Sequence, residues 1–292
     1  MAIKYGTHYV DERYSPLFEP NLYTNAWLVP NVTYTERYTE KAGGIYVHKI
    51  KNVSAVKPKL PTGKKTDHKD AADELIQIAL NNEFFASHMI PDVVAAACAA
   101  DVANAHLSAA TQEVREGREF AALACLVTEG KALTSTTALT AENIKAEIIA
   151  ARTEISNSKG KANVILCSPA VYGMMLNTFG KEFTPVLNDK VQLDGQIAKW
   201  LGFLVVECQA LASPEGVEYI DYTGAEKTVA AAALEDIEFV MYYNEALSVI
   251  DNLSRLRLID TDPDFAGTYA QVMTNTGFRV TNSDLVRVKK HA

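Results

Sequence analysis

The sequence has little of what export, membrane insertion or a disulfide framework would require. Its first residues, MAIKYGTHYVDERYSP, contain no apolar run of signal-peptide length. Its most apolar stretch, residues 93–107, is alanine-rich and is broken by Asp101. It has only four cysteines, which lie far apart in separate apolar stretches (Cys98, Cys125, Cys167 and Cys208). We therefore expect reduced core thiols, no membrane-spanning segment and folding in the cytoplasm.

Recognisable cofactor and metal motifs are also missing. No Gly-x-Gly-x-x-Gly or Gly-x-x-x-x-Gly-Lys-Ser/Thr loop is present, so a nucleotide site would have to be unconventional. The six histidines include no His-x-x-x-His pair and no His–Cys pair at ligand spacing, which speaks against a zinc site. His88 and His106 are interpreted as fillers of the core or the surface. The sequence predicts no metal and no cofactor.

Ser168 stands at a strand-to-helix turn, where a hydrolase would place its nucleophile. Such an elbow needs Gly-x-Ser-x-Gly, whereas the neighbours here are Cys167 and Pro169. Serine before a proline is, however, a common start of a helix. The sequence thus favours a capping role for Ser168 over a catalytic one.

Residues 260–264, DTDPD, alternate three aspartates like the first ligands of a calcium loop. Pro263 intrudes in the pattern, Phe265 stands where such a loop needs glycine, and Gln271 replaces the closing glutamate. Because the bidentate ligand is missing, the segment is predicted to be a polar turn. No catalytic residue is predicted anywhere in the chain.

The bulk composition is that of a folded protein with an acidic surface. Of the 292 residues, 48% are hydrophobic and 22% are charged, which is enough for a sizeable core. The formal net charge is −8. A protein whose main task is to grip nucleic acid needs a basic surface, so that class is disfavoured.

Residues 140–211 predict a layered α/β core. A helix over 140–155, capped by Thr140, is expected to bury one face and to leave three acids on its solvated side (buried Ile144, Ile148, Ala151 and Ile155; solvated Glu142, Glu147 and Glu154). Residues 164–167 form an apolar run too short for a helix, and a short helix over 170–177 follows. A second buried strand is predicted at 202–208.

Two segments before this core are predicted to project from it. Residues 1–44 have little periodicity, three prolines and six tyrosines, so this arm is expected to lie on another subunit or, alternatively, to pack on its own core. Residues 45–89 alternate between apolar and polar positions at both ends, which predicts a long β-hairpin with a loose tip. An isolated two-stranded hairpin is only marginally stable, so it should rest on a partner.

The expected hairpin is strongly basic. Residues 41–69 contain eight lysines and one acid, a net charge of +7 that leaves −15 for the rest of the chain. A basic projection on an acidic body favours contacts between the hairpin of one copy and the body of the next. The simpler alternative is a solvated edge kept soluble by lysine.

The remaining segments complete the order of elements. A long helix is predicted over 93–126, with Gly117 as the point where it could be interrupted. Strands are expected at 217–222 and 237–243, and the last segment, 265–288, suggests two strands around a glycine turn.

The segments ILCSPAVYGMML and GQIAKWLGFLVVECQAL, in this order and spacing, resemble the central part of tailed-bacteriophage major capsid proteins of the Hong Kong 97 type. The resemblance extends from about residue 45 to the C-terminus, and it includes the arm only by position. It implies an α+β Hong Kong 97-like fold with five parts: N-terminal arm 1–44, projecting hairpin (E-loop) 45–90, peripheral domain with spine helix 91–130, axial domain 131–264 and return strands 265–292.

The resemblance also implies a function. The expected protein is a head subunit without enzymatic activity that self-assembles into hexamers and pentamers of an icosahedral shell. The shell encloses double-stranded DNA without sequence-specific binding, and scaffolding, portal and decoration proteins are candidate partners. The expected location is the virion, after assembly in the host cytoplasm. The alternatives are an encapsulin-like compartment shell and a soluble α/β enzyme with an unrecognised site.

Overall fold

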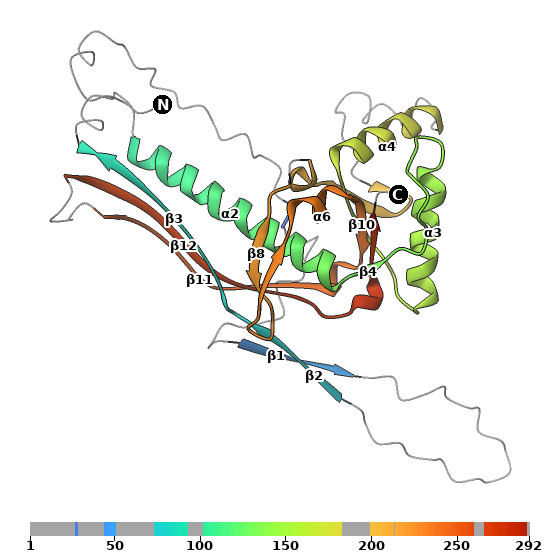
Figure 1. Ribbon diagram of the computed structural model, residues 1–292, viewed down its shortest axis with the longest axis horizontal. Helices are drawn as coiled ribbons and strands as arrows, with labels where there is room; N and C mark the ends of the chain where they lie inside the picture. Colours follow the sequence, from blue (N-terminus) through green and yellow to red (C-terminus); the bar gives the residue numbers. More distant parts are fainter. Residues whose placement is uncertain are drawn as a thin grey trace, which may run out of the picture.

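The computed structural model describes residues 27–28, 44–50, 73–92, 102–182, 199–212, 214–259 and 266–290. They form two joined parts (Figure 1): an elongated part, in which a long helix lies along a narrow sheet, and a compact part around a wider sheet. The α+β class expected from the sequence is therefore confirmed. No helix of the described part is long and apolar enough to span a membrane.

The elongated part is an antiparallel sheet in the order β11 (Leu247–Ile259), β12 (Gly267–Val280), β3 (Asn82–Pro91). Helix α2 (Val102–Glu129) lies along one face of this sheet (Figure 1). Its 28 residues span about 42 Å at 1.5 Å per residue. The burial of β3 alternates along the strand, so that every second side chain faces α2.

Helix α2 differs from its prediction in two details. It runs to Glu129, beyond the expected end at 126, and Gly117 does not interrupt it. Gly117 packs against Phe84 of β3, and a Cβ atom there would lie 3.4 Å from the ring, in ordinary van der Waals contact. The expected first turns, residues 93–101, lie outside the described residues.

The compact part is a mixed six-stranded sheet. Its strands run in the order β4 (Lys131–Ala132), β13 (Val286–Lys290), β10 (Ile237–Tyr242), β5 (Val164–Cys167), β7 (Phe203–Glu207), β6 (Lys199–Trp200). The smaller elements are η1 (Gln209–Leu211), β8 (Val217–Ile220), β9 (Glu226–Val229), α6 (Ala231–Glu235), η2 (Asn244–Ala246) and η3 (Ser283–Leu285). The predicted strands at 164–167, 202–208, 217–222 and 237–243 are thereby confirmed.

Strand β5 shows why its sequence is apolar without a break. Val164 and Leu166 pack into one cluster with the second half of α2, whereas Ile165 and Cys167 pack into another with helix α3 (Ile144–Asn157). Because a strand covered on both faces has no side that faces water, its sequence does not alternate between apolar and polar residues. Helix α4 (Pro169–Glu182) follows directly, with proline at its first position as predicted.

Helix α3 starts later than the sequence predicted. Its first residue is Ile144 and its N-cap is Asn143, because Thr140 caps the preceding turn instead. The Asn143 N–H donates to Thr140 Oγ1 at 3.3 Å, and the Thr140 N–H donates to Asn143 Oδ1 at 2.7 Å. The predicted apolar face is confirmed, since all four of its residues are fully buried (Ile144, Ile148, Ala151 and Ile155).

The prediction that three glutamates merely solvate this helix is wrong for two of them. Lys289 of β13 is completely buried, and its ammonium group donates to Glu147 Oε2 at 3.1 Å and to the Ser135 carbonyl at 3.0 Å. Arg287 of the same strand donates from Nε to Glu154 Oε2 at 3.0 Å. Only Glu142 is exposed as expected. The two acids therefore neutralise cations that strand β13 brings beneath the helix.

The predicted hairpin is confirmed at its base, but its return strand ends at Ala79 and not near Met89. Strands β1 (Gly44–Ile50) and β2 (Asp73–Ala79) pair antiparallel with Ile45 opposite Ile78. Residues 82–91, which were expected to continue the return strand, instead form β3 of the elongated sheet. The lysine-rich tip and the arm before Trp27 lie outside the described residues.

The C-terminal segment contains two strands, as expected, but no glycine turn. Strand β12 continues through Gly277, and the chain turns only at η3 before β13. A Cβ atom at Gly277 would lie 2.5 Å from the Ala79 carbonyl oxygen, so this glycine serves a close approach of the hairpin base.

Sheet membership does not coincide with the expected ranges at two places. Strand β11 falls within 131–264 but pairs with β12 of the elongated sheet. Strand β13 falls within 265–292 but pairs with β10 of the compact sheet. The two parts thus exchange strands near the C-terminus, and the chain crosses between them more often than the five expected ranges imply.

We predict that Glu147→Ala destabilises the purified protein by about 3 kcal/mol, because it leaves the buried Lys289 ammonium without its carboxylate. The matched control is Glu142→Ala at the exposed position, which should change stability by less than about 0.5 kcal/mol. Urea unfolding followed by circular dichroism measures both. Equal midpoints for the two variants would show that Ser135 alone satisfies Lys289.

Candidate assembly interface

The β1–β2 hairpin projects from the body of the protein (Figure 1). It forms a separate two-stranded sheet that pairs with neither larger sheet, and Figure 1 shows it extending away from the body below the elongated sheet. Leu75 on β2 is 60% exposed. Because two strands alone are marginal in water, this hairpin is a candidate for contact with a partner.

The base of the hairpin, in contrast, is firmly attached. Ile78 and Leu80 are buried and pack on Ile250 of β11. The alternation of Ile76, Ile78 and Leu80 predicted from the sequence is confirmed, since all three are buried. The direction in which the hairpin leaves the body is therefore set by packing at its base.

Arg279 of β12 adds a polar clamp at this base. Its guanidinium group donates to the main-chain carbonyl of Gln77 on β2, and its Cζ lies 3.6 Å from the centre of the Tyr222 ring. Arginine stacks well on aromatic rings while donating from its edge. One side chain thus connects β12, the hairpin and the β8–β9 turn, and no local pattern in the sequence could have identified it.

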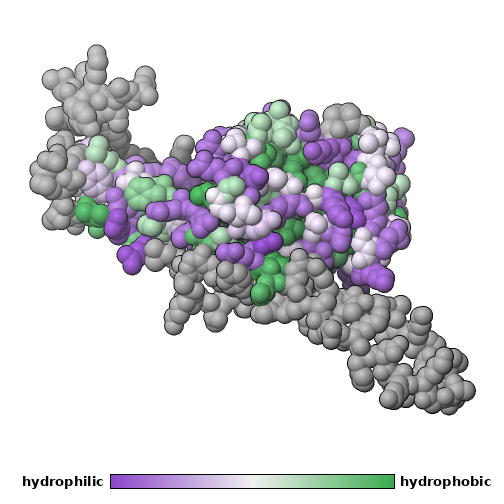
Figure 2. Space-filling model, turned by 60° about the horizontal axis from the view of Figure 1, so that its bottom comes forward, coloured by the Kyte–Doolittle hydropathy of each residue, from purple (hydrophilic) through white to green (hydrophobic). Residues whose placement is uncertain are grey.

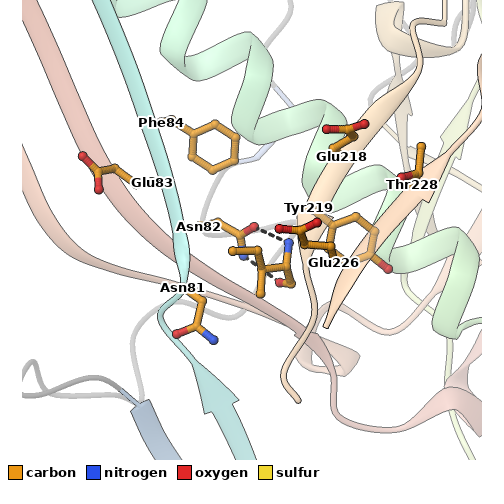
Figure 3. A pocket seen from close by; sticks show the side chains of 9 residues that line it. Asn81, Asn82, Glu83, Phe84, Glu218, Tyr219, Glu226 and Thr228 are labelled. Atoms are coloured by element: carbon orange, nitrogen blue, oxygen red, sulfur yellow. Dashed lines mark hydrogen bonds between the residues drawn. The ribbon is translucent and has the colours of Figure 1, made fainter. Parts of the chain in front are cut away.

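Asn82 makes the second clamp (Figure 3). Its side-chain amide donates to the Ile220 carbonyl at 2.9 Å, and its oxygen accepts the Ile220 N–H at 2.7 Å. The side chain therefore pairs with β8 as another strand would, at the point where β2 gives way to β3. Asn82 is 6% exposed, so neither hydrogen bond is open to competition from bulk water.

A hollow beside Asn82 is lined mainly by polar side chains. Figure 3 shows three carboxylates around it, those of Glu83, Glu218 and Glu226, together with Asn81 and Thr228. No cluster of metal-ligating side chains occurs among the described residues. The hollow is a polar joint between three elements.

The three cysteines of the described part are equally unsuited to chemistry. Cys125, Cys167 and Cys208 are free and buried, as the sequence predicted, and burial raises the pKa of Cys208 to about 12. Burial also raises the pKa of Cys125 and Cys167. These thiols stay protonated at neutral pH and are therefore inert. Cys98 lies outside the described residues.

Exposed apolar side chains gather on the hairpin and the elongated sheet. Among the described residues, five of the six large exposed hydrophobic side chains lie there, whereas the compact part exposes only Ile149 (Leu75, Phe85, Met89, Leu256 and Leu258). Figure 2 shows such hydrophobic patches between hydrophilic side chains. Their concentration in one part favours contacts with other chains there.

The register places several apolar residues on the face turned away from α2. Phe85 pairs with Met273 and Met89 pairs with Tyr269, so these four side chains share that face. The Arg257 Nε–H donates to Gln271 Oε1 at 2.8 Å, and Gln271 donates onward to Ser87 at 3.3 Å across the same face. The result is an amphipathic surface over three strands.

The remaining predicted positions have simple roles or are not described. Ser168 Oγ accepts the Val171 N–H at 3.4 Å, which agrees with the predicted capping role. His88 and His106, expected to be unrelated fillers, are in direct contact at 3.1 Å. The three aspartates of 260–264 and the lysines of 51–72 lie outside the described residues.

Comparison with solved structures identifies the fold. Over 97% of this chain and 98% of the other, it superposes on a structure of Mycobacterium phage Che8 with a TM-score of 0.70 at 16% identity. A capsid structure of the cyanophage P-SCSP1u superposes with a TM-score of 0.71 at 13% identity, over 97% of this chain and 93% of the other. The mature capsid of bacteriophage PhiM1 superposes with a TM-score of 0.64 at 16% identity, over 96% of this chain and 91% of the other.

No family model and no curated protein matches the sequence. The architecture nevertheless agrees with these phage structures over nearly the whole chain. The chain has the fold of phage capsid subunits, and the Hong Kong 97-like fold expected from the two central sequence segments is confirmed.

We predict that Asn82→Ala detaches β8 from the hairpin base and lowers the free energy of unfolding by about 2 kcal/mol, because Ile220 loses both partners. Asn81→Ala, one residue away and exposed, is the control and should have little effect. Hydrogen exchange at the Ile220 amide reports the detachment directly. Full protection of that amide in the Asn82 variant would contradict the clamp.

Proposed function

We propose that this protein is the major capsid protein of a tailed phage, and that its copies assemble as hexamers and pentamers into an icosahedral shell around double-stranded DNA. The observation that carries the proposal is the full-length agreement of the fold with phage capsid structures. The weakly supported hairpin and the apolar side chains of the elongated sheet support it independently. No enzymatic activity is proposed.

The two parts of the structure are assigned to the two domains of a capsid subunit. The compact part, around the six-stranded sheet, is the axial domain, and the elongated part with α2 is the peripheral domain. Strands β11 and β12 are assigned to the peripheral domain, and β13 is assigned to the axial domain. A rigid core with a projecting hairpin suits copies that occupy nearly equivalent positions in a closed shell.

The charge distribution supports contact between hairpin and neighbour. The segment 41–69 carries +7, whereas the rest of the chain carries −15. Attraction between unlike regions and repulsion between bodies would orient each copy against the next. The same acidic body agrees with a shell that encloses DNA without gripping its phosphates. The proposed location is the virion, after assembly in the host cytoplasm with scaffolding, portal and decoration proteins as candidate partners.

We predict that the chain expressed alone, or with its scaffold if one is needed, forms closed particles visible by negative-stain electron microscopy. Particles that contain DNA when recovered from infected cells fit a phage head, whereas a protein cargo would fit an encapsulin-like compartment. A chain that remains monomeric at high concentration under all these conditions would refute the shell.

We also predict that assembly weakens as salt rises from about 0.05 M to about 0.5 M, because screening reduces the attraction between hairpin and body. Lys57, Lys59, Lys64 and Lys65 changed together to glutamate should abolish particles. The smaller variant Lys64→Glu with Lys65→Glu should reduce their yield, as measured by light scattering. Its matched control is Lys159→Glu with Lys161→Glu, two exposed lysines of the compact part. Equal loss in both double variants would indicate that overall charge matters, not the hairpin.

A further inference from the structure

Two histidines meet between the long helix and the sheet. His88 on β3 and His106 on α2 approach with 3.1 Å between their Nδ1 atoms, and their rings stand edge to face at 74°. The other nitrogen of His88, Nε2, lies 2.9 Å from Oε2 of Glu113, which stands about two turns after His106 on α2. Both imidazoles are partly buried.

The contact fixes how many protons the pair can hold. Two imidazole nitrogens can share one hydrogen bond only when one of them carries a proton and the other offers its lone pair. In the neutral pair, His106 donates from Nδ1, and His88 accepts there and donates from Nε2 to Glu113. One added proton leaves this contact intact, because one ring stays neutral. A second added proton puts N–H groups on both Nδ1 atoms, and the contact cannot persist.

The surroundings provide little other charge. On the helix-facing side of the sheet, the side chains next to His88 are uncharged (Ala86, Ile90, Thr268, Ala270 and Val272), and β11 adds the exposed Leu256 and Leu258 on the same face. On α2, Glu113 is in contact, and Glu116 stands three residues further on. Burial and the neighbouring His88 lower the pKa of His106, against the opposing effect of Glu113. Burial and the acids Glu215 and Glu113 raise the pKa of Glu116.

This contact matters because the first half of α2 is held weakly. Its apolar contacts with the sheet are two small clusters, around Val102 with Ile90 and around Ala110 with Val272. Residues 119–126, in the second half, are all buried in the main core. Where few apolar contacts hold an element, a single polar contact contributes a large share of its local stability.

We propose that His88 and His106 form a proton-operated latch between β3 and the first half of α2. The latch is closed with up to one added proton and opens with two, so that acidification loosens this half of the helix while the core remains folded. The latch is a property of the single subunit, and it holds whether or not the subunit builds a shell.

The sign of the pH dependence follows from the lowered pKa of His106. His106 binds a proton less readily in the folded state than in the unfolded state. The stabilisation of the first half of α2 by the latch is therefore fully present above about pH 6.5, the ordinary pKa of histidine. It is lost as the pH falls below that value. The loss should be confined to the elements that the latch joins.

The test is hydrogen exchange with mass spectrometry on the full chain at about pH 7.5 and about pH 5, corrected for intrinsic exchange. We expect peptides from residues 102–114 to lose about tenfold protection on acidification, while residues 119–129 keep theirs. In His106→Gln, which retains polar groups but cannot take up the proton, this loss should disappear. His88→Gln tests the same contact from the other side.

The control is His48→Gln, a histidine on β1 outside the pair, which should respond to pH as the unaltered chain does. Glu113→Gln should shift the opening to higher pH, because the carboxylate no longer offsets the added charge. Unchanged protection of residues 102–114 at about pH 5, or the same loss in both pair variants as in the unaltered chain, would overturn the latch. Equal loss along the whole helix would overturn it as well, since it would indicate global unfolding.

Discussion

The structure depends on the burial of the second half of α2. Every residue from Glu119 to Leu126 is buried, so this half of the helix is covered on all sides instead of presenting one apolar face. The six-stranded sheet contributes Val164, Leu166 and Val240 to the covering, and the elongated sheet contributes Phe278 and Val280. One helix therefore joins both sheets into a single core, and the buried Glu119 forms an ion pair with Arg115, one turn earlier, with 3.6 Å between Nε and Oε1.

The sequence predicted the elements whose signals are local. The apolar run at 164–167, the Ser-Pro helix start and the four-residue spacing of α3 each reflect the immediate neighbours of a residue. Strand β11 escaped prediction because its alternation is interrupted: the register with β12 shifts between Asp251 and Leu253, which moves the later apolar residues to the other phase. A period-two pattern that changes phase halfway leaves no continuous signal to detect.

The joint at the hairpin base could not have been found in this way. Asn82 and Ile220 are 138 residues apart, and Arg279 is 202 residues from Gln77. The same distance in sequence misled the interpretation of Glu147 and Glu154, whose buried partners lie on β13 at the far end of the chain. The sequence of a helix does not distinguish a solvent-exposed glutamate from one that neutralises a buried cation, because the cation lies on another strand.

The uneven burial along α2 has a consequence for assembly. The half of the helix inside the core cannot shift without opening both sheets, so the angle between the two parts is fixed there. The other half is held by two small apolar clusters and a histidine contact, and it lies beside the sheet that exposes Phe85 and Met89. In the proposed shell, copies in nearly equivalent positions would need a region that can deform at small cost, and a weakly held helix half beside the exposed apolar side chains of the sheet would meet that need. The clamps of Asn82 and Arg279 have the opposite effect at the hairpin base, where a change of direction would be amplified along the projecting strands. The hairpin base is therefore stiff and the first half of α2 is compliant, which is the arrangement that the proposed assembly would require.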